Sequence, residues 1–147
     1  MNYKESIAFL DKCINYERIG YAHLTKERHL VDFELFLTRL RSPHRYFPVI
    51  HIAGTKGKGS TAHLLTCALE ACGYRVGLYT SPHIDDYRER IRINMTPISR
   101  DAFADRLTNV VDAYPEDKNY DHSGFRTVFE LLTAMAFLHF LFFRQHH

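Results

Sequence analysis

The stretch from residue 54 to residue 61 restricts the fold of this chain more than any other part of the sequence. Three glycines alternate there with small or cationic residues, and the apolar run 49–53 precedes them. A helical pattern of apolar residues follows, made by Leu64, Leu65, Ala68, Leu69 and Cys72. Glycines let backbone N–H groups turn inward without Cβ clashes, and the next helix points its positive end at the same place. The order strand, glycine-rich turn and helix is therefore typical of a phosphate-binding loop.

The spacing inside this loop departs from the strict P-loop motif. Only Thr55 and Lys56 separate Gly54 from Gly57, and Gly59 stands between Lys58 and the first hydroxyl. A flexible basic turn is the alternative interpretation, but such a turn needs neither a buried strand before it nor a helix after it. In the phosphate-loop interpretation Lys58 contacts the terminal phosphates, and a hydroxyl reaches the bound Mg²⁺. The candidate ATP-binding residues are Gly54, Thr55, Gly57, Lys58, Gly59, Ser60 and Thr61.

Length and charge exclude several classes of protein. The 147 residues amount to one domain, and the formal charge of +2 is too mild and too scattered for a nucleic-acid partner. The N-terminus does not resemble a signal peptide, and no apolar run reaches the roughly 18 residues of a membrane span. We therefore expect a cytoplasmic protein with small-molecule partners, without nucleic-acid or membrane partners.

The first 46 residues are predicted to form a helical N-terminal segment. Apolar residues recur at helical spacing over 3–14 and over 32–41, and Ser42-Pro43 ends the second helix. The polar, irregular stretch 15–31 between them predicts a surface loop.

The α/β part of the chain is predicted to begin at residue 47. Its first strand is 49–53, its helix runs over 59–72 and ends at Gly73, and its second strand is 75–80. Such a βαβ unit is right-handed, so we expect the two strands to be parallel. The loops after their carboxyl ends then share one rim, where ligands bind in open α/β sheets.

Three more elements are predicted toward the C-terminus. Alternating Arg and Ile over 89–94 predict a half-buried strand with a basic outer face. Ser99 can cap a helix, and the polar stretch 116–124 after it predicts a mobile loop. The apolar face of that helix consists of Phe103, Leu107, Val110, Val111 and Tyr114. The last helix, over 127–143, is apolar nearly all round, which is typical of a buried helix.

Three stretches of the chain resemble one enzyme family. The loop G-T-x-G-K-G-S resembles the nucleotide loop of Mur-type ligases, and within them the folylpolyglutamate synthase and dihydrofolate synthase branch. The stretch T-S-P-H, followed by E-R-I-R-I-N, is similar to the second signature of that branch. The stretch T-x-F-E at residues 127–130 is similar to a third. Together these matches cover most of the chain from about Phe47 to Phe140.

The resemblance implies a metal contact at Ser81. A hydroxyl oxygen suits Mg²⁺, which is a hard cation with few protein ligands. A Ser-Pro turn explains the same residues without a metal and is the alternative. The nearby acids Asp85, Asp86 and Glu89 are interpreted as a solvated face and not as ligands.

The resemblance also implies a site for a pterin substrate. Its residues are Thr127, Val128, Phe129 and Glu130. A helix N-cap with a glutamate in the first turn explains Thr127 and Glu130 without any ligand. The chain departs from the family at two positions, since Met95 stands where glycine is usual and Val128 where a second aromatic residue is common.

The implied fold is α/β, a three-layer P-loop-type parallel sheet like the central domain of Mur ligases, incomplete here and preceded by the segment 1–46. Residues 47–147 then form a partial ATP-binding domain, and the family's C-terminal domain is absent. The implied activity is ATP- and Mg²⁺-dependent addition of L-glutamate to a folate or dihydropteroate by a monomeric enzyme. Because the family pattern stops after about Phe140, we expect a truncated chain that is inactive alone. The alternatives are a nucleotide-binding module without ligase activity, or an interaction fragment that folds only with a partner.

Overall fold

The structure, a computed structural model, groups the chain into two compact units. It describes residues 1–13, 26–114 and 127–145. The first unit, here called the helical unit, comprises Met1–Tyr46 and Asp101–His147. The second, here called the sheet unit, comprises Phe47–Arg100.

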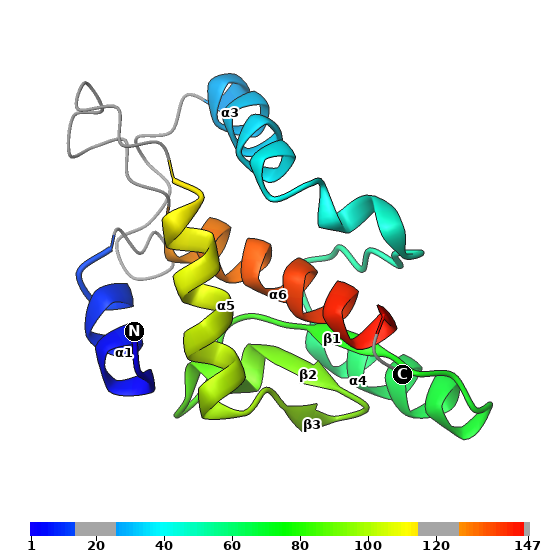
Figure 1. The fold of residues 1–147 in the computed structure, drawn as a ribbon. Coiled ribbons are helices and arrows are strands. Elements are labelled where there is room, and N and C mark those ends of the chain that lie inside the picture. The colour runs from blue at the N-terminus through cyan, green and yellow to red at the C-terminus, as the bar shows by residue number, and fades with distance from the viewer. Residues whose placement is uncertain (14–25, 115–126, 146–147) are drawn as a thin grey trace. The chain divides into compact units, whose positions relative to one another are not determined.

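The helical unit contains four α-helices and one 3₁₀ turn among its described residues (Figure 1). They are α1 (Tyr3–Leu10), α3 (Lys26–Arg39), η1 (Pro43–Tyr46), α5 (Arg100–Asp112) and α6 (Val128–Gln145). The sequence predicted all four helices. However, α1 ends at residue 10 instead of 14, and α3 begins at residue 26, inside the stretch predicted as a loop. The rest of that loop, 15–25, and the predicted loop 116–124 lie outside the described residues.

Apolar side chains from every element of the helical unit form its core. The buried residues include Leu10, Phe36, Leu37, Pro43, Phe103, Leu107, Val110, Leu131, Leu132 and Met135. Ring pairs join α1 to α5 and η1 to α6. The ring centroids of Tyr3 and Phe103 are 5.4 Å apart, and those of His44 and Phe137 are 5.6 Å apart. The apolar face predicted for the helix of residues 100–112 is thus confirmed at its centre.

Helix α6 is the most apolar element of the unit. Its 18 residues have a mean hydropathy of 1.3. Leu131 and Met135 are fully buried, whereas Phe129 and Phe142 are 48% and 41% exposed, so burial covers only part of its surface. By length and composition α6 is the one helix in the described part of the chain that could cross a membrane. The core helix of a soluble protein meets the same criterion, so length and composition alone do not identify α6 as a membrane span.

The sheet unit contains helix α4 (Lys58–Ala71), the 3₁₀ turn η2 (Tyr87–Arg90) and three short strands. The strands are β1 (Gly77–Tyr79), β2 (Ile91–Ile93) and β3 (Thr96–Pro97), in the spatial order β1-β2-β3. Both ladders are antiparallel, with Leu78 opposite Arg92 and Ile93 opposite Thr96. Helix α4 contacts β1. The buried side chains of the unit include Thr66, Leu78, Tyr87, Ile91 and Ile98.

Helix α4 ends at the glycine that the sequence indicated. Gly73 has φ 84°, in the left-handed region. Its N–H donates to the carbonyl of Glu70 at 2.8 Å, and the N–H of Tyr74 donates to the carbonyl of Leu69 at 3.0 Å. This pair of hydrogen bonds is a Schellman motif, which satisfies carbonyls that the helix leaves without partners. It turns the chain out of α4 ahead of β1.

Two sequence predictions about the sheet are wrong for the described chain. The run 49–53 forms no strand, and every strand pair among the described residues is antiparallel. Val49 and Ile50 are 61% and 64% exposed. An apolar run becomes a strand only where a neighbour takes up its backbone hydrogen bonds, and the described residues supply none there. The strand predicted over 89–94 is shorter, and Arg90, predicted on a basic outer face, is 1% exposed.

Candidate functional site

The glycine-rich loop leads directly into the N-terminus of α4. Gly57 is the N-cap residue of this helix and has φ 74°, a left-handed conformation that glycine adopts without strain. No described side chain caps the first turn, and no acidic residue lies in it. The first N–H groups of α4 therefore lack helical acceptors. Together with the helix dipole they favour an anion at this position.

Lys58, the first residue of α4, reaches back across the loop. Its Nζ donates a hydrogen bond to the carbonyl oxygen of Gly54 at 2.6 Å. All seven candidate ATP-binding residues, from Gly54 to Thr61 without Lys56, are exposed. The loop thus presents a cation, backbone N–H groups and three hydroxyls to solvent, and such groups bind phosphate oxygens.

Ser81 follows β1 closely and lies in the same unit as the glycine loop. It is exposed, and its peptide bond to Pro82 is cis. The N–H of Thr80 donates to the carbonyl of Arg90 at 3.0 Å, which fixes the chain just before Ser81. Among the residues that the structure describes, no group of three or more His, Cys, Asp and Glu converges to hold a metal ion. A single hydroxyl beside phosphate oxygens is the kind of donor set that Mg²⁺ accepts.

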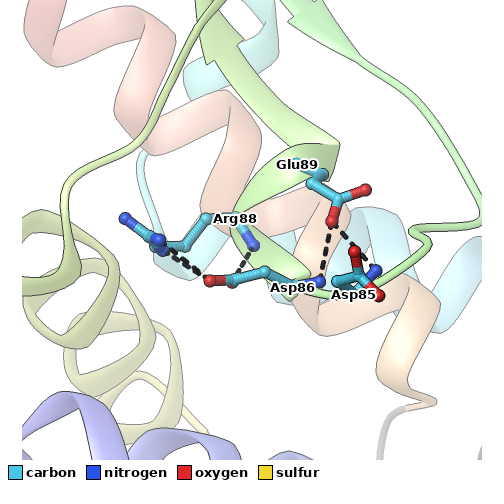
Figure 2. A network of polar contacts seen from close by, with 4 residues as sticks. All are labelled: Asp85, Asp86, Arg88 and Glu89. Atoms are coloured by element: carbon cyan, nitrogen blue, oxygen red, sulfur yellow. Dashed lines mark hydrogen bonds and ion pairs between the residues drawn. The ribbon is translucent and has the colours of Figure 1, made fainter.

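The acidic residues after Ser81 have a role that sequence reasoning missed. The carboxylate of Glu89 accepts hydrogen bonds from the backbone N–H groups of Ile84, Asp85 and Asp86, at 3.0, 3.0 and 2.8 Å. Figure 2 shows the two bonds from Asp85 and Asp86. Asp86 in turn accepts from Arg88 through its backbone N–H and its side chain, both within 3.0 Å. Asp86 and Glu89 therefore form a capping box for η2. The D-x-x-E spacing was the sequence signal for it.

The pKa of Glu89 is lowered by these contacts. The main causes are the hydrogen bonds from the backbone N–H groups of Ile84, Asp85 and Asp86, with a smaller contribution from His83. Donors that surround a carboxylate favour its charged form. These acids lie at the surface, as the sequence suggested, and they also organise the loop through their hydrogen bonds.

The candidate pterin residues lie in the helical unit, at the start of α6. The N–H of Thr127 donates to the Glu130 carboxylate at 2.9 Å, and the N–H of Glu130 donates to the Thr127 hydroxyl at 3.1 Å. This capping box is the alternative explanation that the sequence offered for both residues. Val128 is 1% exposed and Phe129 is 48% exposed, so Phe129 is the ring of this stretch that a ligand can reach.

Comparison with solved structures defines the class of protein first. A complex of folylpolyglutamate synthase with AMPPCP and folate matches with a TM-score of 0.79 and 35% identity, over 99% of this chain and 33% of that chain. The chain therefore has the fold of this Mur ligase-type class. No family model matches the chain.

Curated relatives then give the family. The chain is 38% identical over 109 residues to dihydrofolate synthase/folylpolyglutamate synthase of Bacillus subtilis, which is 74% of this chain and 25% of the relative. It is 33% identical over 140 residues to folylpolyglutamate synthase of Lacticaseibacillus casei, which is 95% of this chain and 31% of the relative. The chain belongs to the folylpolyglutamate synthase/dihydrofolate synthase family. It spans about a quarter to a third of the length of these relatives.

Proposed function

We propose that this chain is the nucleotide-binding part of an ATP-dependent ligase that joins L-glutamate to a folate or to dihydropteroate. The observation that carries the proposal is the uncapped N-terminus of α4, which follows a glycine N-cap and begins with Lys58. The relatives are named for folylpolyglutamate and dihydrofolate synthesis, and one solved relative holds AMPPCP and folate. Both findings support ATP as the ligand of the glycine loop.

In the proposed reaction a carboxylate of the pterin substrate attacks the γ-phosphorus of ATP, and ADP leaves. The amine of L-glutamate then attacks the resulting acyl phosphate, inorganic phosphate leaves, and an amide forms. The part of this chain is to position the phosphates and to offset their charge. Lys58 supplies the cation, and the N–H groups of the loop supply fixed dipoles.

Ser81 and residues 127–130 complete the proposal. Ser81 would hold Mg²⁺, which when bound neutralises charge on the phosphate oxygens. Residues Thr127, Val128, Phe129 and Glu130 would contact the pterin, with the exposed ring of Phe129 as the stacking surface. The capping box leaves the Thr127 and Glu130 side chains partly engaged, so Phe129 has the larger share of this contact.

We also propose the domain boundaries and the type of sheet in such a ligase. In a protein of the relatives' length, residues 1–46 form a helical segment, and 47–147 form part of a three-layer ATP-binding domain. The run 49–53 then joins a parallel sheet, which the exposure of Val49 and Ile50 in this chain supports. For the 147 residues alone we propose nucleotide binding without ligation, because they span only a quarter to a third of the relatives.

Calorimetric titration of ATP·Mg²⁺ against the chain and its Lys58→Ala variant tests the nucleotide site. A charge-assisted contact contributes roughly 1.5–3 kcal/mol, so the variant should bind about 10- to 150-fold more weakly. Lys56→Ala is the matched control, because it removes the same charge from the same exposed loop. Equal affinity in the Lys58 variant and the wild type would remove Lys58 from the site.

A Ser81→Ala variant tests the metal contact. Its ATP affinity should fall when Mg²⁺ is present and stay near the wild-type value when Mg²⁺ is chelated. An equal loss in both conditions would indicate a defect in the turn instead. Product formation that requires both ATP and glutamate, measured with the 147-residue chain, would contradict the proposal that this chain alone does not ligate.

A further inference from the structure

The loop that carries Ser81 is held in place by two consecutive residues of η2. Glu89 binds the backbone N–H groups of residues 84 to 86 through both of its carboxylate oxygens, and Figure 2 shows the bonds from Asp85 and Asp86. Oε2 accepts from Ile84, and Oε1 accepts from both Asp85 and Asp86. One side chain thereby replaces water at three successive donors, which restricts the backbone of this loop.

Arg90, the next residue, holds the loop at a second place. It is 1% exposed, and its Nε donates to Nδ1 of His83 at 2.7 Å. The His83 ring also contacts the Tyr87 ring, with centroids 4.3 Å apart and an interplanar angle of 47°. The carbonyl oxygen of Arg90 accepts the N–H of Thr80 at 3.0 Å. Residues on both sides of Ser81 are thus bonded to Arg90.

We propose that Glu89 is a positioning residue for the reaction, because it fixes the loop 81–86 in the shape in which the Ser81 hydroxyl meets its metal. This inference rests on the function proposed above, in which Ser81 contacts Mg²⁺. Glu89 itself touches neither nucleotide nor metal in the proposal. It acts through the three backbone N–H groups that it binds.

The chemistry of the contact requires a carboxylate at position 89. An ionised carboxylate offers two acceptor oxygens and no donor, whereas an amide offers one oxygen and a donating NH₂ group. In Glu89→Gln at least one of the three N–H groups therefore loses its acceptor or faces another donor. The change is isosteric and lies at a site open to solvent, so it alters the loop without removing packed volume.

The test combines hydrogen exchange with nucleotide titration on the whole chain. In Glu89→Gln the amides of residues 84–86 should exchange about tenfold faster or more, since a lost hydrogen bond to a charged acceptor has an effect of that order. The Mg²⁺-dependent part of ATP affinity should fall, as in Ser81→Ala, while affinity without Mg²⁺ stays near the wild-type value. Asp85→Asn is the matched control, because it removes an equal charge from the same loop, and it should leave both measurements unchanged.

Two outcomes would overturn the inference. Unchanged exchange at residues 84–86 would show that Glu89 does not hold the loop. Fast exchange with full Mg²⁺ dependence would show that the loop contact is structural only. A Glu89→Asp variant keeps both carboxylate oxygens on a shorter side chain and should recover part of both losses. If the wild type itself shows no Mg²⁺-dependent ATP binding, the proposed function fails, whereas the exchange rates still report whether Glu89 holds the loop.

Discussion

The turn between β2 and β3 is made by two residues with left-handed backbone. Asn94 has φ 47° and Met95 has φ 59°. Two successive positive φ values are the signature of the tight hairpin turn that matches strand twist. Asn94 is a suitable residue there, and its Oδ1 also accepts the N–H of Val76 at 2.8 Å. Met95 has a Cβ that this conformation strains.

A glycine at position 95 should relieve this strain. Met95→Gly loses the side chain and the strain together, whereas Met95→Ala loses the side chain but keeps the Cβ. The glycine variant should be more stable than the alanine variant by roughly 0.5–1 kcal/mol, after the greater freedom of unfolded glycine is counted. Denaturant unfolding of both variants measures this difference. A glycine variant no more stable than the alanine variant would show that the turn is unstrained.

His139 is a buried histidine whose charge the fold disfavours. It is 4% exposed, and its Nδ1 has no hydrogen-bond partner among the described residues. Burial, and then the nearby charge of Arg106, lower its pKa from 6.5 to about 4. The unfolded chain therefore binds a proton at this residue at a pH where the folded chain does not.

The stability of the chain should fall as the pH falls from about 6.5 toward 4. In this window His139 is protonated in the unfolded state but stays neutral in the folded state, so protonation favours unfolding. His139→Leu should unfold with a shallower pH dependence in the same window, since leucine does not titrate. Chemical denaturation at intervals from pH 7.5 to pH 4 measures both slopes. Identical slopes would mean that His139 is not the residue responsible.

At the scale of elements, two glycines at the start of α4 should differ in how they affect stability and ligand binding. Gly57 has positive φ, whereas Gly59 lies inside the helix, and a Cβ on Gly59 would meet no described atom within 4 Å. Glycine inside a helix costs about 1 kcal/mol relative to alanine. Packing within the described chain therefore does not require a glycine at position 59.

Gly59→Ala should stabilise the chain and weaken ATP binding at the same time. The first effect follows from helix propensity, by up to about 1 kcal/mol, and the second from a Cβ placed where phosphate oxygens approach the backbone. Thermal melts and ATP titration measure the two effects on one protein. Gly57→Ala is the comparison, because its left-handed backbone predicts lower stability. ATP affinity unchanged in Gly59→Ala would show that the ligand keeps away from this position.

The elements that the sequence predicted correctly are those specified by near neighbours. Helix α4 has a glycine at each end, and the helix of residues 100–112 has a regular apolar face. The run 49–53 was wrongly predicted to be a strand, because strand formation depends on residues far away in the chain. Residues 89 and 90 were wrongly included in a predicted strand for a local reason. The capping box at Asp86 places them in the 3₁₀ turn η2, in spite of the alternation of Arg and Ile that follows.

At the scale of the whole molecule, the structure places the candidate site residues in two units. The glycine loop and Ser81 belong to the sheet unit, and residues 127–130 belong to the helical unit. The glycine-rich turn ahead of α4 could be predicted from residue type, because it is local, and phosphate binding there stays a prediction. The roles proposed for Ser81 and Phe129 rest on the family resemblance and stay predictions, since a serine in a turn or an exposed ring carries no chemical signature of its own.

The exposed apolar residues of the sheet unit should make the isolated chain prone to associate. Val49, Ile50 and Leu64 are 61%, 64% and 72% exposed. In helix α6, by contrast, Leu131 and Met135 are fully buried, as the sequence predicted for that helix. Each large apolar side chain left in water forfeits roughly 1.5–3 kcal/mol of burial free energy. The double variant Val49→Thr, Ile50→Thr should bind less hydrophobic dye and sediment more nearly as a monomer. Unchanged dye binding would place the association surface elsewhere.

The hydrogen bond from Lys58 to the Gly54 carbonyl should make the glycine loop selective for charged ligands. The Gly54 carbonyl competes with any ligand for the Lys58 ammonium group. A ligand must therefore offer Lys58 a better acceptor than this carbonyl. Phosphate oxygens meet this requirement through their charge, and neutral hydroxyls of similar size do not. The same bond also keeps the ammonium group against the loop backbone in the structure. Uncharged molecules should therefore bind this loop more weakly than a polyphosphate, which offers Lys58 a stronger acceptor than the carbonyl.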